Sequence, residues 1–349
     1  MEFGMFHEFR CAPGGGHDEA FASAFAEIDA AERMGLDVIW LSELHMDPVR
    51  SVLSSPLTVA SAVAVRTRRI RIGTAVQVLP LAHPVRIAEE AATVDHISRG
   101  RLIFGVGRSG LPRGYDGYGI SYGESQARFP EALALIKRAW TESNFSYQGK
   151  FFSGKNVNLS PKPFQRPHPP IRVAANSADT FPVVGALGDA IMVAGRIGPL
   201  KDLIPNIATY REAWRAAGHV GRGEVYLRIP VYIAETDARA REEPEDSIMT
   251  FYRLLGARIE ASADASGVRA VERRAERGRG LQTITYEEAL RDKLVVGSPA
   301  RVVERLIQLR EELGFDGILA ELNCGGLIPP ARVMNSLRML CEEVLPRFR

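Results

Sequence analysis

A carboxylate and an imidazole follow one of the strongly apolar runs of the sequence. Residues 38–41 (VIWL) are too short and too apolar for anything but a buried strand, and Glu43 and His45 come directly after them. At a strand end this pair could supply an acid, a base or a fixed hydrogen-bond donor. The alternative is a histidine that bonds only a neighbouring backbone group, and the spacing alone leaves both interpretations open.

Residues 105–110 (GVGRSG) match the letters of the GxGxxG dinucleotide fingerprint. That fingerprint requires its glycines to open a helix, and an acidic residue about 20 positions on to end the next strand. Here more glycines follow, so we expect no helix before about Ser125. No acidic residue stands at a strand end either. We reject a dinucleotide site and predict a long glycine-rich loop, which reaches Gly123 and carries Arg108 and Arg113.

Small residues and hydroxyls precede the helix that the sequence predicts over residues 180–187. The run AANSADT, which ends at residue 180, places Ser177 and Thr180 where hydroxyls and free backbone N–H groups can bind an anion, typically a phosphate. An ordinary helix N-cap formed by Ser177 or Asp179 is the alternative.

Two arginines are candidates for the same anion. Arg108 lies in the predicted glycine-rich loop, and Arg128 lies in a helix predicted over residues 125–141. A bidentate guanidinium suits phosphate, so both could converge on the anion that Ser177 and Thr180 would bind. Two arginines and a hydroxyl-bearing helix start would together hold one phosphate monoester.

Apolar runs alternate with amphipathic helical patterns along the whole chain, and the candidate residues stand at their ends. The expected strands cover residues 3–6, 38–41, 70–79, 101–104, 170–174, 190–193, 226–233 and 317–322. The expected helices cover residues 21–31, 56–65, 84–98, 125–141, 180–187, 200–217, 298–313 and 330–345. This alternation predicts an α/β fold, a closed (β/α)8 TIM barrel, with a doubly wound open sheet as the competing architecture.

Two segments do not fit the simple repeat. Residues 142–169 are rich in Pro, Asn and aromatic residues and are expected to form an insertion before the fifth strand. Residues 236–297 are polar and Arg-rich, with RAVERRAERGRG at 269–280, and are expected to form a helical lid before the eighth strand. The alternative for this charge run is an anionic-ligand site. We interpret residues 1–349 as a single barrel domain.

The composition fits an enzyme with a large core and argues against several other classes. The 349 residues have a net charge of +2, so no strong field favours nucleic acid or a membrane surface. No apolar run approaches about 20 residues, and the N-terminus lacks the features of a secretion signal. The spacing of Cys11, Cys324 and Cys341 fits neither a disulfide framework nor a thiolate zinc site. We expect a cytoplasmic enzyme without a bound metal.

Longer stretches resemble the bacterial luciferase-like, flavin-dependent monooxygenases over nearly the whole chain. The matching stretches are FGMF, GLDVIWLSELH, RIRIGTAVQVLPLAHPVRIAEEAATVDHISRGRLIFGVGRSG, RVAANSADT and KLVVGSPARVVERL. The most specific is LPLAHPVRIAEE followed by D-x-x-S-x-G-R. The resemblance implies a (β/α)8 barrel that uses reduced FMN and O2 as co-substrates, usually as a homodimer.

The resemblance also implies roles for individual residues. The positions that match the family's flavin-binding residues are Ala75, Val76, Arg108, Arg128, Ala175, Asn176, Ser177 and Thr180. The two arginines and the two hydroxyl residues of this set match positions that bind the flavin phosphate. Ala75 and Val76 stand where the family often has a non-proline cis peptide beneath the flavin ring, and Asn176 falls near the ring edge. Phe6 falls where an aromatic residue lines the substrate pocket.

One departure from the family pattern follows the second strand. The family signature usually reads Glu-His-His, and its first histidine is tied to catalysis in the luciferases, whereas this chain has Glu43, Leu44 and His45. Leu44 can neither donate nor accept a proton, so luciferase-type aldehyde oxidation with light emission is not expected. Leu44 would instead widen the apolar wall of the substrate pocket. His45 would hydrogen-bond the peroxide or the substrate, with Glu43 orienting it.

The resulting hypothesis is a two-component monooxygenase. We expect a separate NAD(P)H:flavin reductase to supply reduced FMN, because the barrel accounts for the chain and leaves no nicotinamide domain. O2 would add to flavin C4a to give a peroxyflavin, which transfers one oxygen atom to a small organic molecule that the sequence does not identify. Two alternatives stay open: a deazaflavin-dependent enzyme that transfers hydride without oxygen, and a flavin-binding protein without turnover.

Overall fold

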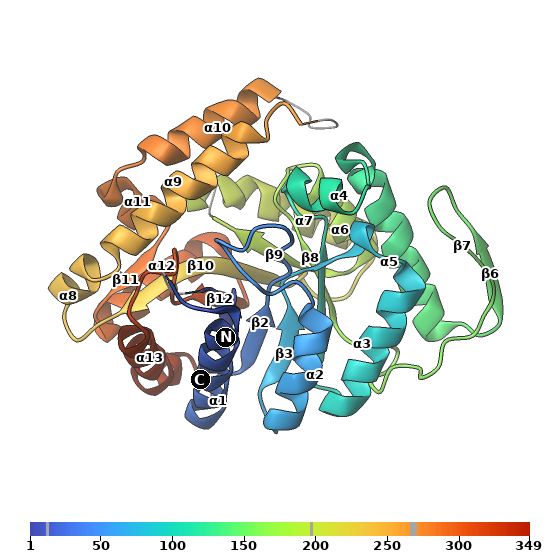
Figure 1. Cartoon of the computed structure of the whole chain (residues 1–349), viewed down its shortest axis with the longest axis horizontal. Helices are drawn as coiled ribbons and strands as arrows, with labels where there is room; N and C mark the ends of the chain where they lie inside the picture. The colour runs from blue at the N-terminus through green and yellow to red at the C-terminus, as the bar shows by residue number, and fades with distance from the viewer. Residues whose placement is uncertain (12–13, 196–197, 266–270) are drawn as a thin grey trace.

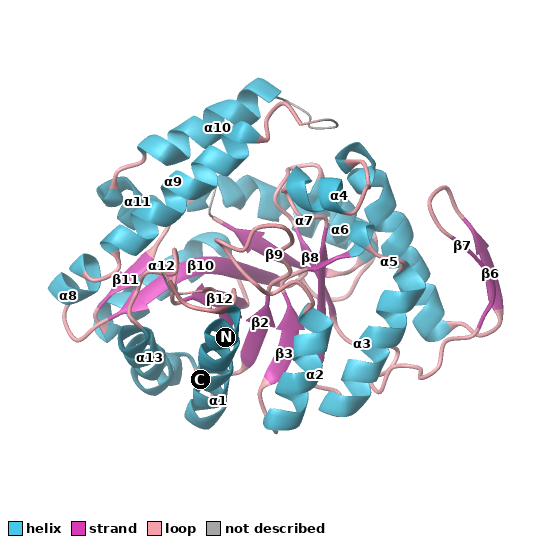
Figure 2. Cartoon of the chain, viewed as in Figure 1, coloured by secondary structure: helices cyan, strands magenta, loops and turns pink. Residues whose placement is uncertain are grey.

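Parallel strands close into a barrel at the centre of the molecule, and helices surround it (Figures 1 and 2). The computed structural model describes residues 1–11, 14–195, 198–265 and 271–349. The eight barrel strands, in their order of pairing, are β1 (Glu2–His7), β2 (Val38–Leu41), β3 (Arg71–Thr74), β5 (Leu102–Gly107), β8 (Ile171–Ala174), β9 (Ala190–Ala194), β10 (Val225–Ile233) and β12 (Gly317–Glu321). Since β12 pairs with β1, the sheet is closed and the predicted (β/α)8 barrel is confirmed.

The helices around the barrel begin and end close to the predicted positions. They are α1 (His17–Met34), α2 (Pro56–Arg66), α3 (Pro84–Ser98), α5 (Ser125–Thr141), α6 (Thr180–Leu187), α7 (Leu203–Ala216), α12 (Pro299–Leu313) and α13 (Pro330–Met339). Four of them start with proline, whose missing N–H is unneeded there, and Gly35, Gly188 and Gly314 end α1, α6 and α12 in the left-handed conformation. Within the described ranges, no helix has both the length and the apolar character needed to cross a membrane.

Short helical turns extend three of these elements. The turns η1 (Leu79–Leu81) and η3 (Leu200–Asp202) precede α3 and α7. The helix predicted over residues 330–345 ends earlier, at α13, and continues as the π-helical turn η4 (Leu340–Val344) and the turn η5 (Leu345–Phe348). The proline inside η5 cannot donate the backbone hydrogen bond that a longer α-helix would need.

Three segments differ from the sequence-based expectation. The insertion folds into an antiparallel hairpin of β6 (Phe145–Gln148) and β7 (Ser153–Val157), which projects at the edge of the molecule (Figure 1). The glycine-rich segment contains α4 (Pro112–Gly117) and η2 (Tyr122–Glu124), so the expectation that no helix starts before α5 was wrong. The single strand expected over residues 70–79 is divided into β3 and β4 (Gln77–Val78), which both pair with β5.

The segment predicted as a lid is helical and has an apolar core of its own. It comprises α8 (Asp237–Glu242), α9 (Glu245–Ala261), α10 (Val271–Thr283), α11 (Tyr286–Asp292) and the unpredicted β11 (Val295–Gly297), which pairs with β10. Buried residues of α9, α10 and α11 pack into a cluster separate from the barrel core. Residues 266–270, part of the predicted lid and of its charge run, lie outside the described residues. Whether the segment opens and closes stays a prediction.

The narrow interior of the barrel is filled around one large ring. Trp40 on β2 is fully buried, and the neighbouring strands β1 and β3 face it with Gly4 and Gly73. A Cβ at Gly73 would lie 2.2 Å from the six-membered ring of the indole, and one at Gly4 would lie 2.4 Å from its nitrogen. Both positions therefore need glycine because the ring leaves no space for a side chain.

We predict that Gly73→Ala lowers the free energy of unfolding by about 1–3 kcal/mol, because the buried indole has no room to move away. Urea denaturation of the two proteins measures this difference. Gly280→Ala is the control, since a Cβ there meets nothing within 4 Å and the exposed helical position favours alanine. Equal stabilities of the Gly73 variant and the wild type would contradict the packing argument.

Candidate active site

Glu43 and His45 form a hydrogen-bonded pair at the end of β2. His45 Nε2 lies 2.7 Å from Glu43 Oε1, and Glu43 Oε2 accepts hydrogen bonds from the Gln77 side-chain amide (2.6 Å) and the Val78 backbone N–H (2.8 Å). Burial raises the pKa of Glu43, although the hydrogen bonds from His45 and Val78 oppose the rise. The structure thus brings the predicted pair together and adds Gln77, and the catalytic role of the pair stays a prediction.

The contact with Glu43 determines which nitrogen of His45 is available. When Glu43 is ionised it only accepts hydrogen bonds, and His45 Nε2 is then the donor of their hydrogen bond. In the neutral imidazole Nδ1 is then an acceptor, and the Tyr118 hydroxyl lies 3.3 Å from it. Tyr118 directly follows α4 and packs against the imidazole at nearly a right angle. No sequence pattern indicated Tyr118, because an exposed tyrosine between glycines is typical of a loop.

Arg108 follows β5 and has most of its guanidinium free of protein contacts. Its Nη1 lies 3.5 Å from the Ser125 hydroxyl, which is a long hydrogen bond. Among the described residues, no other hydrogen bond from this guanidinium is formed. Its backbone carbonyl accepts a hydrogen bond from the buried Tyr115 hydroxyl, which fixes the start of the glycine-rich segment. Arg108 is therefore held at its backbone and has donors left for a ligand.

Arg128 on α5 already has partners within the chain. Its Nη1 donates to Glu124 at 3.1 Å, and its guanidinium lies about 5 Å from the ring centroids of Phe151 and Phe152, which belong to the insertion. Its Nε is buried without a hydrogen-bond partner. The insertion thus holds Arg128 by ring stacking. Whether Arg128 and Arg108 converge on one anion stays a prediction.

The hydroxyl-bearing start of α6 has the predicted form. The Ser177 and Thr180 hydroxyls lie 2.9 Å apart, and the Asp179 side chain at the N-cap makes no capping hydrogen bond. Asp179 therefore does not cap α6 through its side chain. Before the helix, Asn176 is exposed, and Ala175 is buried with its N–H bonded to the Met192 carbonyl. Because β5 and β8 are neighbours, this helix start and Arg108 rise from adjacent strands.

Small residues stand at the carboxyl ends of the neighbouring strands β3, β5 and β8. The peptide bond between Ala75 and Val76 is cis, as the resemblance implies. A Cβ at Gly107 would lie 2.7 Å from Val76 and 3.3 Å from the Ala174 side chain. The segment after β3 therefore packs directly against the end of β5 and leaves no space for a side chain at Gly107.

The two predicted substrate-pocket residues have different surroundings. Leu44 is half-buried beside the pair, and its backbone N–H donates to the Leu53 carbonyl. Phe6 is buried in the barrel interior, and the Arg228 guanidinium lies 3.3 Å from its ring centroid. An arginine therefore covers one face of Phe6, which the sequence did not predict.

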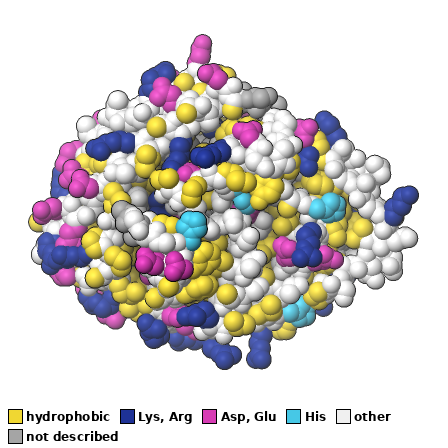
Figure 3. Space-filling model, in the orientation of Figure 1, with side chains coloured by type: hydrophobic (Ala, Val, Ile, Leu, Met, Phe, Trp, Pro, Cys, Tyr) yellow, Lys and Arg dark blue, Asp and Glu magenta, His cyan; other side chains and the backbone are white. Residues whose placement is uncertain are grey.

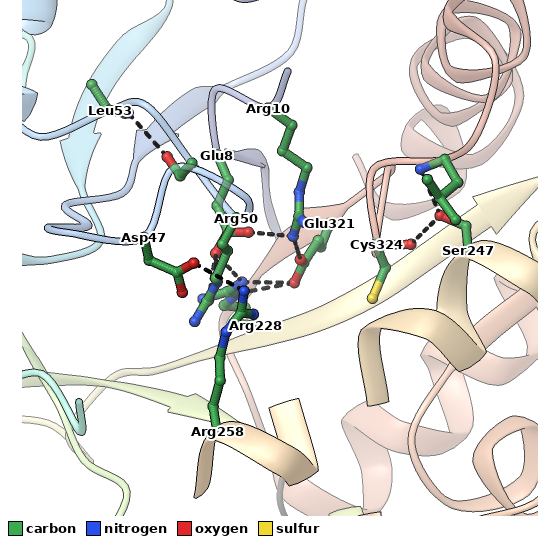
Figure 4. Close-up of polar contacts among 12 residues, drawn as sticks. Glu8, Arg10, Asp47, Arg50, Leu53, Arg228, Ser247, Arg258, Glu321 and Cys324 are labelled. Atoms are coloured by element: carbon green, nitrogen blue, oxygen red, sulfur yellow. Dashed lines mark hydrogen bonds and ion pairs between the residues drawn. The ribbon is translucent and has the colours of Figure 1, made fainter. Parts of the chain in front are cut away.

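Charged residues that no sequence pattern indicated form a network at the strand ends (Figure 4). This mouth cluster consists of Glu8, Arg10, Asp47, Arg50, Arg228, Arg258 and Glu321. Buried Glu8 lies 2.5 Å from Arg50 and 3.4 Å from Arg228 and also pairs with Arg10, while Glu321 lies 2.7 Å from Arg228 and 3.5 Å from Arg10. Burial would raise the pKa of Glu8, but the arginines hold it well below its ordinary value.

A cavity of about 250 Å³ borders the mouth cluster without being the predicted flavin site. It is lined by Phe6, Glu8, Arg10 and Glu321 on one side and by residues of α1 and α13 on the other. The candidate phosphate groups after β5 and β8 do not line it. We therefore place the active site by the strand ends and their polar groups, not by this cavity.

Comparison with known sequences gives the family. The profile of the luciferase-like monooxygenases matches residues 1–317. The chain belongs to the luciferase-like monooxygenase family. The family membership that the sequence motifs implied is confirmed, and the chain is an enzyme of a monooxygenase family.

Curated relatives extend the comparison. The uncharacterized protein y4wF of Sinorhizobium fredii is 35% identical over 180 residues, and the match spans about half of each chain. The oxygenase component of flavin-dependent trigonelline monooxygenase from Acinetobacter baylyi is 24% identical over 100% of this chain and 96% of that protein. Limonene 1,2-monooxygenase from Rhodococcus erythropolis is 24% identical over 92% of this chain and 80% of that protein.

Solved structures share the fold over the whole chain. Monooxygenase RslO1 from Streptomyces bottropensis has a TM-score of 0.82 and 26% identity, with 100% of both chains covered. The oxygenating constituent of 3,6-diketocamphane monooxygenase from Pseudomonas putida, in complex with FMN, has a TM-score of 0.81 at 21% identity. The match covers 99% of this chain and 98% of that chain. An F420-dependent secondary alcohol dehydrogenase has a TM-score of 0.76 at 17% identity, with 100% of this chain and 99% of that chain covered. At such identities, the last two similarities show the fold alone.

The burial of Glu8 among arginines leads to a stability prediction. Glu8→Gln leaves buried guanidinium groups short of a counter-charge. We expect it to lower the free energy of unfolding by about 3–5 kcal/mol at pH 7. The folded pKa of Glu8 lies below its unfolded value near 4.5, so its contribution is present above pH 4.5 and is lost as the pH falls. The difference between the variant and the wild type should therefore shrink by roughly 1 kcal/mol from pH 7 to pH 4.

Urea unfolding at the two pH values measures both effects. Glu90→Gln is the control, because Glu90 pairs with Arg86 at the surface, where ion pairs contribute little. The argument fails if the loss of unfolding free energy in Glu8→Gln does not change with pH. It also fails if that loss is as small as the loss in Glu90→Gln. Either result would show that Glu8 is not the charged centre of the mouth cluster.

Proposed function

We propose that this protein is an FMN-dependent, two-component monooxygenase. The observation that carries the proposal is the anion site that Arg108, Ser177 and Thr180 would form on adjacent strands β5 and β8. It stands on the same barrel face as the Glu43–His45 pair, which follows β2. The diketocamphane enzyme, which has the same fold and was solved in complex with FMN, supports flavin use by this fold.

The residues present fit FMN on structural grounds. The unused donors of Arg108 and the uncapped start of α6 would hold the phosphate, because both offer N–H groups to an anion. The buried, unpartnered Nε of Arg128 is a further donor near the start of α5. Ala75, Val76 and Gly107, whose close packing leaves no space for a side chain at Gly107, would lie against the ring. Bound in reduced form, FMN supplies the electrons that activate O2.

The protein groups then position protons and exclude water. Glu43 holds the proton on His45 Nε2, which leaves Nδ1 as the acceptor that faces Tyr118. When substrate displaces the Tyr118 hydroxyl, Nδ1 can accept a proton from the reacting group, and Glu43 stabilises the imidazolium that results. Leu44, the glycine-rich segment and the lid would keep the site poor in water, which prevents wasteful loss of reducing power.

Partners and setting follow from the same proposal. Reduced FMN would come from a separate NAD(P)H:flavin reductase, and the trigonelline relative, named as an oxygenase component, supports this division. We also propose a homodimer in the cytoplasm that acts on a small organic molecule. The deazaflavin alternative stays open, since an F420-dependent enzyme has the same fold. Flavin binding without turnover is the third outcome.

Flavin binding distinguishes an FMN-dependent enzyme from an F420-dependent one. We expect the protein to bind reduced FMN more tightly than reduced riboflavin, and Arg108→Gln to lose about 10- to 100-fold in FMN affinity with little effect on riboflavin. Titration calorimetry under anaerobic conditions measures the four affinities, with Arg113→Gln as the control because Arg113 is exposed on α4 of the same segment. Binding of F420 in preference to FMN would overturn the proposal in favour of hydride transfer.

The rate at which hydrogen peroxide is released tests the role of His45. In the protein loaded with reduced FMN and mixed with O2, we expect His45→Ala to release hydrogen peroxide at least about 10-fold faster than the wild type, because Nδ1 and the ordered Tyr118 contact are lost. Stopped-flow mixing with a peroxide-coupled dye gives the rates. His17→Ala, at an exposed position on α1, serves as the control. Unchanged peroxide release in His45→Ala would remove His45 from the mechanism.

A further inference from the structure

The mouth cluster contains more guanidinium groups than carboxylates. Four arginines face Glu8, Asp47 and Glu321, and no ion pair among the described residues joins another carboxylate to these arginines. Arginine stays protonated at physiological pH, and an uncompensated charge in a partly buried site is costly. The cluster therefore has one positive charge in excess, which an anion at the barrel mouth would balance.

Arg258 is the arginine of the cluster that a ligand can reach. Its side chain keeps 25% of its surface exposed, compared with 13% for Arg10, 6% for Arg50 and 11% for Arg228. It extends from α9 of the lid toward Asp47, and Nη2 donates to Asp47 Oδ1 at 2.9 Å (Figure 4). No other hydrogen bond from Arg258 to a described residue is formed, so the rest of its planar fork of donors can hold a second acceptor.

The position of Arg258 relates it to the substrate side of the site. Asp47, which holds it, comes two residues after His45 in the same loop. Phe6, the predicted pocket residue, lies beneath the guanidinium of Arg228 in the same cluster. The candidate phosphate site follows β5 and β8, whereas the cluster is built on β1, β10 and β12 across the barrel. The phosphate of a bound flavin therefore does not account for the excess charge.

We propose that Arg258 binds a carboxylate of the substrate, so that the enzyme oxygenates an organic acid rather than a neutral compound. The proposal rests on the proposed function and adds the class of substrate to it. A carboxylate matches the guanidinium fork in charge and shape and balances the mouth cluster. Because Arg258 belongs to the lid, the bound acid also joins α9 to the loop of His45. Arg258 is thus a specificity-determining residue.

Binding of matched acids and amides, without any flavin, tests the proposal. The probes are acetate, cyclohexanecarboxylate, benzoate, nicotinate and decanoate, each paired with its primary carboxamide. We expect the wild type to bind at least one acid about 10-fold or more tightly than its amide, as measured by titration calorimetry. Arg258→Gln should lose this preference, while Arg258→Lys, which keeps the charge but not the fork, should retain part of it.

Controls separate this proposal from the others. Arg253→Gln changes an exposed arginine on the same helix and should leave the acid preference intact. Arg258→Gln should bind FMN and riboflavin as the wild type does, and a selective loss of FMN affinity would instead assign Arg258 to the flavin phosphate. No preference for any acid, or a preference that survives in Arg258→Gln, overturns the proposal. Because this experiment contains no flavin, a negative result overturns only the role of Arg258. The monooxygenase proposal is tested separately by the flavin-binding and peroxide experiments.

Discussion

The filling of a narrow closed barrel determines where its polar groups stand. Trp40 occupies the interior only because Gly4 and Gly73 leave space for it on both sides. Phe6, Tyr226 and Leu319 pack in the same layer. Side chains alternate along a strand, so the next inward residues on β1, β10 and β12 are two positions further on. These are Glu8, Arg228 and Glu321. Arg228 pairs with both carboxylates, because the apolar layer beneath them excludes the water that would otherwise solvate their charges.

The strand order then separates two regions of positive charge. Arg108 and the start of α6 rise from β5 and β8, while the mouth cluster rises from β1, β10 and β12. The Glu43–His45 pair follows β2, which pairs with β1 and β3 and lies between the two regions. A ligand phosphate and a ligand carboxylate can therefore be held apart, with the proton-carrying pair between them. This separation is a property of barrel closure and not of any single motif.

Those parts of the fold that depend on local pattern could be predicted from the sequence. Buried parallel strands are continuous apolar runs, so residues 38–41 and 317–321 were identifiable, and prolines and glycines marked the helix ends. The hairpin at residues 145–157 was missed because most of its side chains are polar or exposed and show no alternating apolar face. The six-residue α4 was missed because two of its residues are glycine, which is typical of loops.

The candidate site could be predicted only where its members are close in sequence. Glu43 and His45 are two residues apart, and Ser177 and Thr180 three, so their pairing was visible in the pattern. Glu8 and Glu321 share arginine partners although 313 positions separate them, and only the pairing of β1 with β12 brings them together. Long-range ion pairs leave no local signature, because arginine and glutamate are common on exposed helix faces.

The lid is held to the barrel mouth by contacts that a ligand can influence. Its helices pack around an apolar core of their own, to which Cys324 of the loop after β12 also belongs. Two arginines of the lid make polar contacts with the mouth: Arg258 donates to Asp47, and Arg274 donates to the Gly110 carbonyl of the glycine-rich segment. Such half-exposed contacts contribute little by themselves. An anion that bridges Arg258 and the mouth would add to them, so substrate binding and closure of the site would be coupled through the same guanidinium.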